Sequence, residues 1–262
     1  MTKPPERSRS VDLNVDVGEF REALADGREE GLLHLVTSAN VACGGHAGDE
    51  ETMAGVLAVA CRLAVSVGAH PGYPDRVGFG RTSMRMTPDE IETTVFEQVE
   101  RLAGVARKVG CSVVHVKPHG ALYNDAAQDR AVAAAVARGA RRWSPEVVLV
   151  GLAGSRALEV FESEGLLAVA ECFADRAYEA DGALRSRRLP GALITDPETA
   201  AAQAVSIALK GCVTAYGGET VSVRADTICI HGDNPQAIAI AQRVRAALTS
   251  VGVVVTRLVG PA

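Results

Sequence analysis

The strongest constraint on the fold is a repeated unit in which a short apolar strand ends in a polar loop that leads into a helix. The unit recurs about seven times along the chain of 262 residues, from a strand at 11–17 to a strand-like run at 253–258. Alternating strands and helices favour a parallel sheet, and right-handed crossovers allow such a sheet to close. We predict an α/β fold with a closed β/α barrel, and an open doubly wound sheet is the alternative.

The alternation of strands and helices continues without a linker rich in Pro, Gly or Ser, so residues 11–262 are expected to form one barrel domain. Residues 1–10 are polar and are expected to be a flexible tail. This tail lacks the apolar core of a signal peptide, and no apolar run reaches the length that spans a bilayer. We therefore expect a cytoplasmic protein.

Composition narrows the classes of partner. The net charge is −5 and the pI is near 5.7, which argues against a surface for nucleic acid or for an anionic membrane. The six cysteines include no Cys-x-x-Cys pair and lie mostly in apolar stretches, so we expect them to be reduced and buried.

Polar residues alternate with apolar ones in the first strand, 11–17. Period 2 places Asp12, Asn14 and Asp16 on one face, although Asp and Asn are poor strand formers. That face is either exposed to solvent in an antiparallel sheet or directed into the lumen of a barrel. We favour the lumen, with a site near Asp16 and the Gly18-Glu19 corner that ends the strand.

The stretch 113–124, VVHVKPHGALYN, carries the densest set of polar groups. It starts as an apolar strand and ends in a loop that holds Lys117, His119, Tyr123 and Asn124. Ligands bind at the carboxyl ends of strands in parallel α/β folds. We therefore expect these side chains to face a site.

Histidines follow four different strands at the same end. These are His46, His70, His119 and His231, whereas His34 is expected on a helix and His115 within a strand, both with structural roles. The expected ring of polar side chains at the barrel mouth also includes Asp12, Asn14, Asp16, Glu19, Lys117 and Asp233.

Two loops are longer than a minimal strand–helix connection. Residues 73–81 are rich in glycine, and residues 173–196 carry several acidic residues and arginines. We predict that both loops cover the site and are its most flexible ordered segments.

Six motifs together resemble the LamB/YcsF family, which includes the A subunit of the ATP-dependent 5-oxoprolinase. They are LNVDVGE, SANVACGGHAGD, GAHPGYPDRVGFGR, VKPHGALYN, ECFADRAYEADG and CIHGD, and they span nearly the whole chain. The resemblance implies an irregular seven-stranded parallel β/α barrel, TIM-like and related to polysaccharide deacetylases. Two positions depart from the family pattern, since Val15 replaces its usual Cys and Gly45 often replaces a Phe.

The resemblance also implies an activity and partners. The family acts with two further subunits, B and C, which resemble the Kip-type pair, and opens the lactam of 5-oxoproline to L-glutamate while ATP is hydrolysed to ADP and phosphate. The sequence has no P-loop, so a partner subunit is expected to bind much of the ATP. The chain alone is expected to be inactive, and a homo-oligomer stays open.

Opening a lactam requires activated water, for which a carboxylate or a neutral imidazole is the usual base. Asp16 is our first candidate, with His70 or His119 second. Lys117 either neutralises a phosphate or carboxylate, or is a structural partner of Asp12 or Asp16. Arg81 and Arg176 are either forks for an anion or members of surface ion pairs. The expected substrate-binding residues are Asp12, Asn14, Glu19, His46, Arg81, Tyr123, Asn124, Arg176, His231 and Asp233.

Two other classes of function stay open. A metal-dependent amide hydrolase or deacetylase of the same fold would use a catalytic zinc ion, for which Asp16, His46 and His70 are the candidate ligands. A non-catalytic scaffold would bind its partner subunits and one metabolite.

Overall fold

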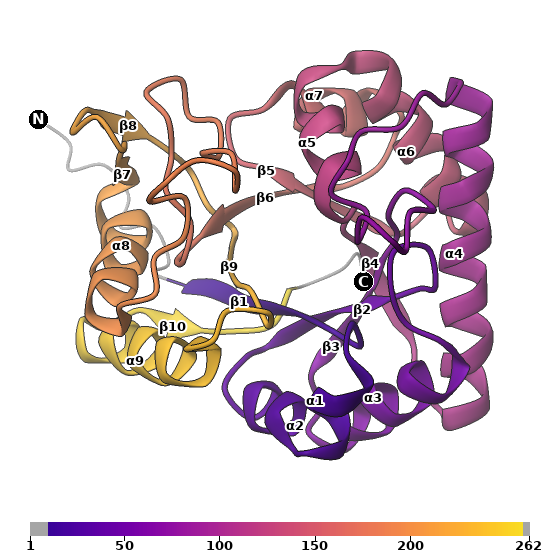
Figure 1. The fold of residues 1–262 in the computed structure, drawn as a ribbon, viewed down its shortest axis with the longest axis horizontal. Coiled ribbons are helices and arrows are strands. Elements are labelled where there is room, and N and C mark those ends of the chain that lie inside the picture. Colours follow the sequence, from indigo (N-terminus) through magenta and orange to yellow (C-terminus); the bar gives the residue numbers. More distant parts are fainter. Residues whose placement is uncertain (1–9, 259–262) are drawn as a thin grey trace, which may run out of the picture.

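The computed structural model describes residues 10–258, which form a closed parallel barrel surrounded by helices (Figure 1). The barrel strands are β1 (Ser10–Val17), β2 (Ser38–Ala42), β3 (Ser66–His70), β4 (Val113–Val116), β5 (Val148–Leu152), β6 (Ala168–Phe173) and β9 (Thr227–Ile230). Each strand pairs in parallel with the next in this order, and β9 returns to β1.

Closure depends on the double pairing of β1. Val15 lies opposite Ala39 of β2 on one side and opposite Ile230 of β9 on the other. The prediction of a seven-stranded β/α barrel is therefore confirmed, and the open sheet is wrong. A further strand, β10 (Val254–Val255), pairs with the first two residues of β1. Ser10 therefore belongs to a strand, and the rest of the expected tail, residues 1–9, lies outside the described residues.

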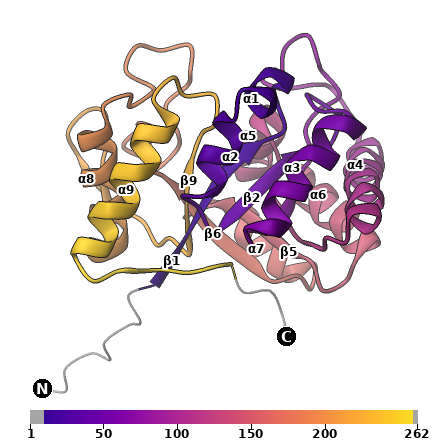
Figure 2. The same cartoon turned by 90° about the horizontal axis from the view of Figure 1, so that it is seen from below.

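Helices cover the outside of the barrel (Figures 1 and 2). They are α1 (Arg21–Ala25), α2 (Arg28–Leu33), α3 (Glu50–Arg62), α4 (Pro88–Val109), α5 (Gly120–Gln128), α6 (Arg130–Trp143), α7 (Arg156–Ser163), α8 (Pro197–Lys210) and α9 (Ala237–Ser250). Local sequence explains several starts: Asp49 and Thr87 form capping boxes, and Asp196 accepts from Thr199 N. In the described part of the chain, no helix is long and apolar enough to span a membrane.

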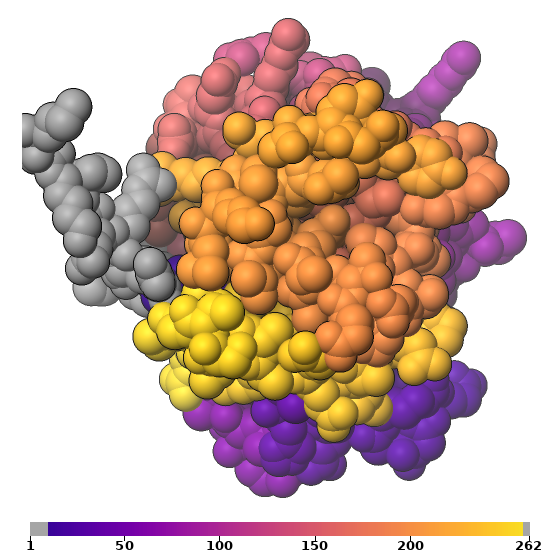
Figure 3. Space-filling view, turned by 90° about the vertical axis from the view of Figure 1, so that its left-hand side faces the viewer, coloured from indigo at the N-terminus to yellow at the C-terminus, as the bar shows by residue number. Residues whose placement is uncertain are grey.

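The local sequence also predicts that the runs 220–223 and 227–230 form a strand pair, and this prediction is wrong. β8 (Thr220–Ser222) instead pairs antiparallel with β7 (Cys212–Thr214), outside the barrel. β9 joins the barrel because its four residues are all buried, as a strand between two parallel neighbours requires. The β7–β8 hairpin and α8 lie on the side of the molecule shown in Figure 3, above α9.

The expectation that all six cysteines are reduced is wrong for two of them. Cys61 of α3 and Cys111, which precedes β4, form a disulfide, whereas Cys43, Cys172, Cys212 and Cys229 are free. The two half-cystines are 50 residues apart in sequence, so no local spacing pattern signals their pairing.

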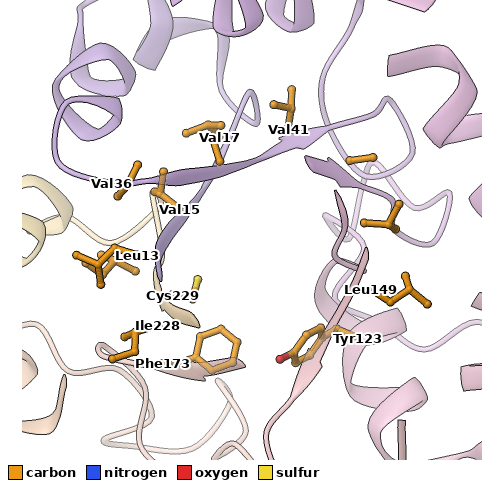
Figure 4. Close-up of a cluster of buried hydrophobic side chains, with 14 of the residues drawn as sticks. Leu13, Val15, Val17, Val36, Val41, Tyr123, Leu149, Phe173, Ile228 and Cys229 are labelled. Atoms are coloured by element: carbon orange, nitrogen blue, oxygen red, sulfur yellow. The ribbon is translucent and has the colours of Figure 1, made fainter. Parts of the chain in front are cut away.

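The apolar core lies mainly between the strands and the helices. Leu13 and Ile228 lie side by side on the outer face of β1 and β9, whereas Phe173, Cys229 and Tyr123 face the interior (Figure 4). Because Leu13, Val15 and Val17 point outwards, the alternating residues of β1 point into the lumen. The prediction of a polar lumen face on β1 is confirmed, since all three polar side chains there are buried.

Glu29 supplies a test of the packing beneath the first loop. Its Oε1 accepts from Gly18 N at 2.7 Å, while burial raises the pKa of Glu29 to about 7. A raised carboxyl pKa stabilises the fold below the ordinary pKa, and this contribution is lost as the pH rises through 7. Glu29→Gln should therefore stabilise the protein by about 2 kcal/mol more at pH 8 than at pH 5. Urea unfolding at the two pH values measures this difference, and Glu97→Gln on the exposed face of α4 is the control. An equal effect at both pH values would contradict the account.

Candidate functional site

A cavity of about 1060 Å³ opens at the carboxyl ends of the strands. Nine of the expected site residues line it: Asp16, His70, Arg81, Lys117, His119, Tyr123, Asn124, Arg176 and His231. The remaining five, Asp12, Asn14, Glu19, His46 and Asp233, are not part of this lining. The loops at 73–81 and 173–196 contribute Arg81, Arg176, residues 181–184 and residues 186–188 to the wall, so both border the cavity as expected, and their flexibility stays a prediction.

Lys117 is the central cation of the site, and its side chain is only 2% exposed. Its Nζ lies 2.9 Å from Asp16 Oδ1, 2.9 Å from Glu171 Oε1 and 3.1 Å from Cys229 Sγ. Burial alone would lower the pKa of Lys117, but these acidic neighbours hold it well above its ordinary value. Lys117 is therefore charged and paired within the lumen.

Asp16 ends the polar face of β1 at the cavity. Its Oδ1 accepts from Lys117 Nζ and from Asn40 Nδ2, at 2.9 and 2.8 Å, and its Oδ2 lies 3.4 Å from His70 Nε2. Burial alone would raise its pKa, but His70 and Lys117 hold the pKa of Asp16 well below its ordinary value. Asp16 is thus an ionised carboxylate, which suits it to orient groups more than to abstract protons.

Asp12 and Asn14 lie deeper in the barrel and have structural partners. Asp12 accepts hydroxyl hydrogen bonds from Thr37, Ser38 and Thr227 at 2.6–2.7 Å. Asn14 donates to Glu171 and accepts from Asn40. The structure therefore does not bring these two side chains to the substrate cavity.

Three histidines meet beside Asp16. His70 Nδ1 lies 2.7 Å from Lys117 O, and His119 Nε2 lies 2.9 Å from Phe79 O. Since a carbonyl oxygen only accepts, each of these ring nitrogens carries a proton. The other nitrogens, His70 Nε2 and His119 Nδ1, are 3.0 Å apart. His46 stacks on His119 with 3.6 Å between ring centroids, and Glu19 Oε1 lies 3.3 Å from both of these rings.

Gly80 allows this close approach. Its φ is +63°, and a Cβ there would lie 2.8 Å from His46 Cβ. The loop can therefore press Phe79 O against His119.

Burial is the largest cause that lowers the pKa of His46, to about 2, and burial likewise lowers the pKa of His119. Both imidazoles are therefore neutral.

A second imidazole–carboxylate pair faces the cavity from β9. His231 Nδ1 lies 2.8 Å from Asp175 Oδ1, and Asp175 Oδ2 accepts from the His231 backbone N at 3.1 Å. Burial would raise the pKa of Asp175, but His231 lowers it below its ordinary value. Because the carboxylate binds Nδ1, the other ring nitrogen, Nε2, is the one that can exchange a proton with a molecule in the cavity.

Arg81 and Arg176, the two arginines expected to bind an anion, differ in how many of their N–H donors are free for a ligand. Arg176 is buried and donates to the carbonyls of Ala192 and Arg185, so much of its donor capacity is used within the 173–196 loop. Arg81 and Arg187 both pair with Asp233. Two guanidinium groups therefore share one carboxylate at the rim, which leaves excess positive charge there.

The expected metal ligands are not the ones that the structure groups together. The described residues contain two groups of potential ligand atoms within 4.8 Å of one another, Asp16–Cys229–His231 and Glu19–His46–His119. The set Asp16, His46 and His70 is not among them.

The structure adds site residues to which the sequence analysis gave no role. Glu171 is fully buried and pairs with Lys117, Asn40 binds Asp16, and Asp175 binds His231. A carboxylate in the apolar strand AVAECF and an amide in SANVA were the available signals. Their pairing across the barrel was not readable from local sequence.

This fold and cavity define a β/α-barrel protein with ionisable side chains gathered at the carboxyl ends of the strands. The chain belongs to the LamB/YcsF family, whose model matches residues 11–261.

Curated relatives extend the match over nearly the full length. The 5-oxoprolinase A subunit of Chloroflexus aggregans is 51% identical over 94% of this chain and 98% of its own length. That of Methylococcus capsulatus is 47% identical over 97% of both chains. The "Lactam Utilization Protein" of Thermus thermophilus superposes with a TM-score of 0.88 at 43% identity, over 95% of this chain and all of the other. The Bc1960 peptidoglycan N-acetylglucosamine deacetylase, at 12% identity and a TM-score of 0.50 over 97% of this chain and 88% of its own, shows the fold alone.

Removing the buried cation should destabilise the barrel. Lys117→Met leaves Asp16 and Glu171 buried without their cation, and breaking a buried pair costs about 3–5 kcal/mol. Urea unfolding measures the loss. Arg21→Met, which removes an exposed ion pair with Asp49 and Glu51, should cost far less, because solvent screens that pair. Similar losses for the two variants would show that Lys117 is not the electrostatic centre of the lumen.

Proposed function

We propose that this chain is the A subunit of an ATP-dependent 5-oxoprolinase, which opens the lactam of 5-oxoproline to L-glutamate as ATP is hydrolysed to ADP and phosphate. The observation that carries the proposal is the separation of charge in the cavity. Lys117 faces two carboxylates, Asp16 and Glu171, whereas Arg81 and Arg187 face one, Asp233. The names of the curated relatives support the same assignment.

This charge separation matches the substrate, which has a carboxylate at one end and a neutral amide at the other. The rim arginines supply the excess positive charge and the bidentate geometry that a carboxylate or a phosphate requires. The Lys117 ammonium is already neutralised, so it is poorly suited to hold a second anion. The lactam is therefore assigned to the Asp16 end of the cavity and the substrate carboxylate to the arginine rim.

The chemistry requires an activated amide and an activated water. Transfer of the ATP γ-phosphoryl group to the lactam oxygen would release ADP and make the carbonyl carbon a better electrophile. Water would then attack that carbon, with an imidazole as base. The carbon–nitrogen bond of the resulting adduct would break as the ring nitrogen takes up a proton, and a second water would hydrolyse the acyl phosphate to glutamate and phosphate. His231 fits this role best, because Asp175 fixes its tautomer and Nε2 is left for the cavity. Asp16, with its lowered pKa, is assigned to orient the reacting groups.

ATP is proposed to bind mainly through the two partner subunits, B and C. The sequence carries no P-loop, and the relatives are named as one subunit of an enzyme, which implies a complex. The cavity would then be completed by surfaces that this chain does not supply.

A glutamate-release assay tests the reaction itself. The pure chain should release little or no glutamate from 5-oxoproline, because its own residues offer no phosphate-binding loop. Addition of both partners and ATP should give sustained release, with one ADP formed per glutamate. Robust ATP-dependent release by the single chain would contradict the division of roles, and release by the complex without ATP would contradict the coupling.

Substitutions test the assignments in the assembled complex. Asp16→Asn and His231→Gln should each lower kcat by roughly 10²–10⁴, the usual contribution of a group that orients or transfers a proton. His34→Gln, on an exposed turn, is the matched control and should leave kcat unchanged. Melting temperatures are measured on the same samples. Early melting with near-normal kcat at low temperature would show that the residues are structural.

A further inference from the structure

Glu19, His46 and His119 form a buried cluster in which the Glu19 carboxylate and the His46 ring are only partly satisfied by hydrogen bonds. Among the described residues, Glu19 Oε1 and both ring nitrogens of His46 are buried without a hydrogen-bond partner. Unsatisfied buried polar atoms cost free energy and are uncommon in native folds. The cluster therefore has the character of a site that awaits a ligand.

The protonation pattern makes the cluster an acceptor site. His119 donates through Nε2 to Phe79 O, so its Nδ1 carries a lone pair, and this nitrogen lies 3.0 Å from His70 Nε2 and 3.3 Å from Glu19 Oε1. A histidine that binds a metal commonly donates its other N–H to a backbone carbonyl, which is the arrangement seen here. Glu19 Oε1 lies 3.3 Å from His46 Nε2 as well.

The distances between these ligand atoms fit the coordination of one shared metal ion better than they fit hydrogen bonds. Two ligands at about 2.0–2.1 Å from a tetrahedral zinc ion lie about 3.3–3.4 Å apart. The three ligand atoms all lie within 4.8 Å of one another. Two imidazoles and one carboxylate are a known ligand set for catalytic zinc, with the fourth position open. Since a lone pair lies in its ring plane, the stacked His46 and His119 rings would turn apart as the ion binds.

We propose that Glu19, His46 and His119 bind a single divalent transition-metal ion, with Zn²⁺ the best match, and that the open coordination position lies on the side of His70. His70 Nε2 is 3.0 Å from His119 Nδ1 and 3.4 Å from Asp16 Oδ2. The ion therefore adjoins the cavity wall that His70 and Asp16 form.

The other group of potential ligands is a poorer site. Lys117 Nζ already lies 2.9 Å from Asp16 and 3.1 Å from Cys229. A divalent ion between Asp16, Cys229 and His231 would face this buried ammonium at short range, where like charges repel strongly. No lysine or arginine in the described part of the chain makes an ion pair with Glu19 that would compete in the same way.

Metal binding is measured without reference to any activity, so its failure is separate from failure of the proposed reaction. The full chain is purified without chelator or nickel resin, stripped with EDTA and titrated with Zn²⁺ by calorimetry at pH 7.5. We expect one ion per chain and a higher melting temperature with excess ion. Glu19→Gln and His46→Gln should each weaken binding at least 100-fold. Cys229→Ser and His34→Gln are matched controls and should leave the affinity unchanged.

Cobalt gives a readout that needs no variant. Co²⁺ bound to the stripped wild-type chain should show the intense visible absorption of a four-coordinate site, and excess Zn²⁺ should abolish it. The absence of stoichiometric binding of either ion would overturn the proposal and would indicate that protons satisfy the cluster. Equal affinity in wild type, Glu19→Gln and His46→Gln would place the ion elsewhere and would also overturn it.

Discussion

The structure depends on one buried ammonium group. Lys117 enters the lumen from the end of β4 and meets carboxylates from β1 and β6, which lie on different sides of the ring. Removal of three charges from water is costly unless geometry and hydrogen bonds compensate. Here Asn14 donates to Glu171 and Asn40 donates to Asp16, so that a polar network replaces the apolar filling of an ordinary small barrel.

The charged side chains divide the site into two regions of opposite net charge. The carboxylates around Lys117 give the inner end a small excess of negative charge, while the arginines at the rim give the mouth an excess of positive charge. A substrate with one charged end would be drawn in a single orientation.

Local pattern was enough to predict much of this arrangement. The alternation in β1 identified the lumen face, and the histidines after four strands identified the site end of the barrel. The number of strands came from the family resemblance, because β7 and β8 have the same local composition as barrel strands. Glu171 and Asp175 received no role because their partners, Lys117 and His231, lie more than 50 residues away along the chain. Only three-dimensional pairing decides whether such a carboxylate is buried and functional or merely solvated.

Closure of the barrel between β1 and β9 has a consequence for synthesis. Thr227 bonds to Asp12, and Cys229 lies opposite Asn14, across more than 200 residues of chain. Contacts of such high sequence separation form late, since the entropy of closing the intervening loop must be lost before they add stability. A nascent chain therefore holds Asp16 for most of its translation, and Lys117 for the later part of it, without the strand that seals the lumen around them. The lumen network and the last barrel strand are completed in the same event, so a partly made chain exposes charges that the folded protein buries.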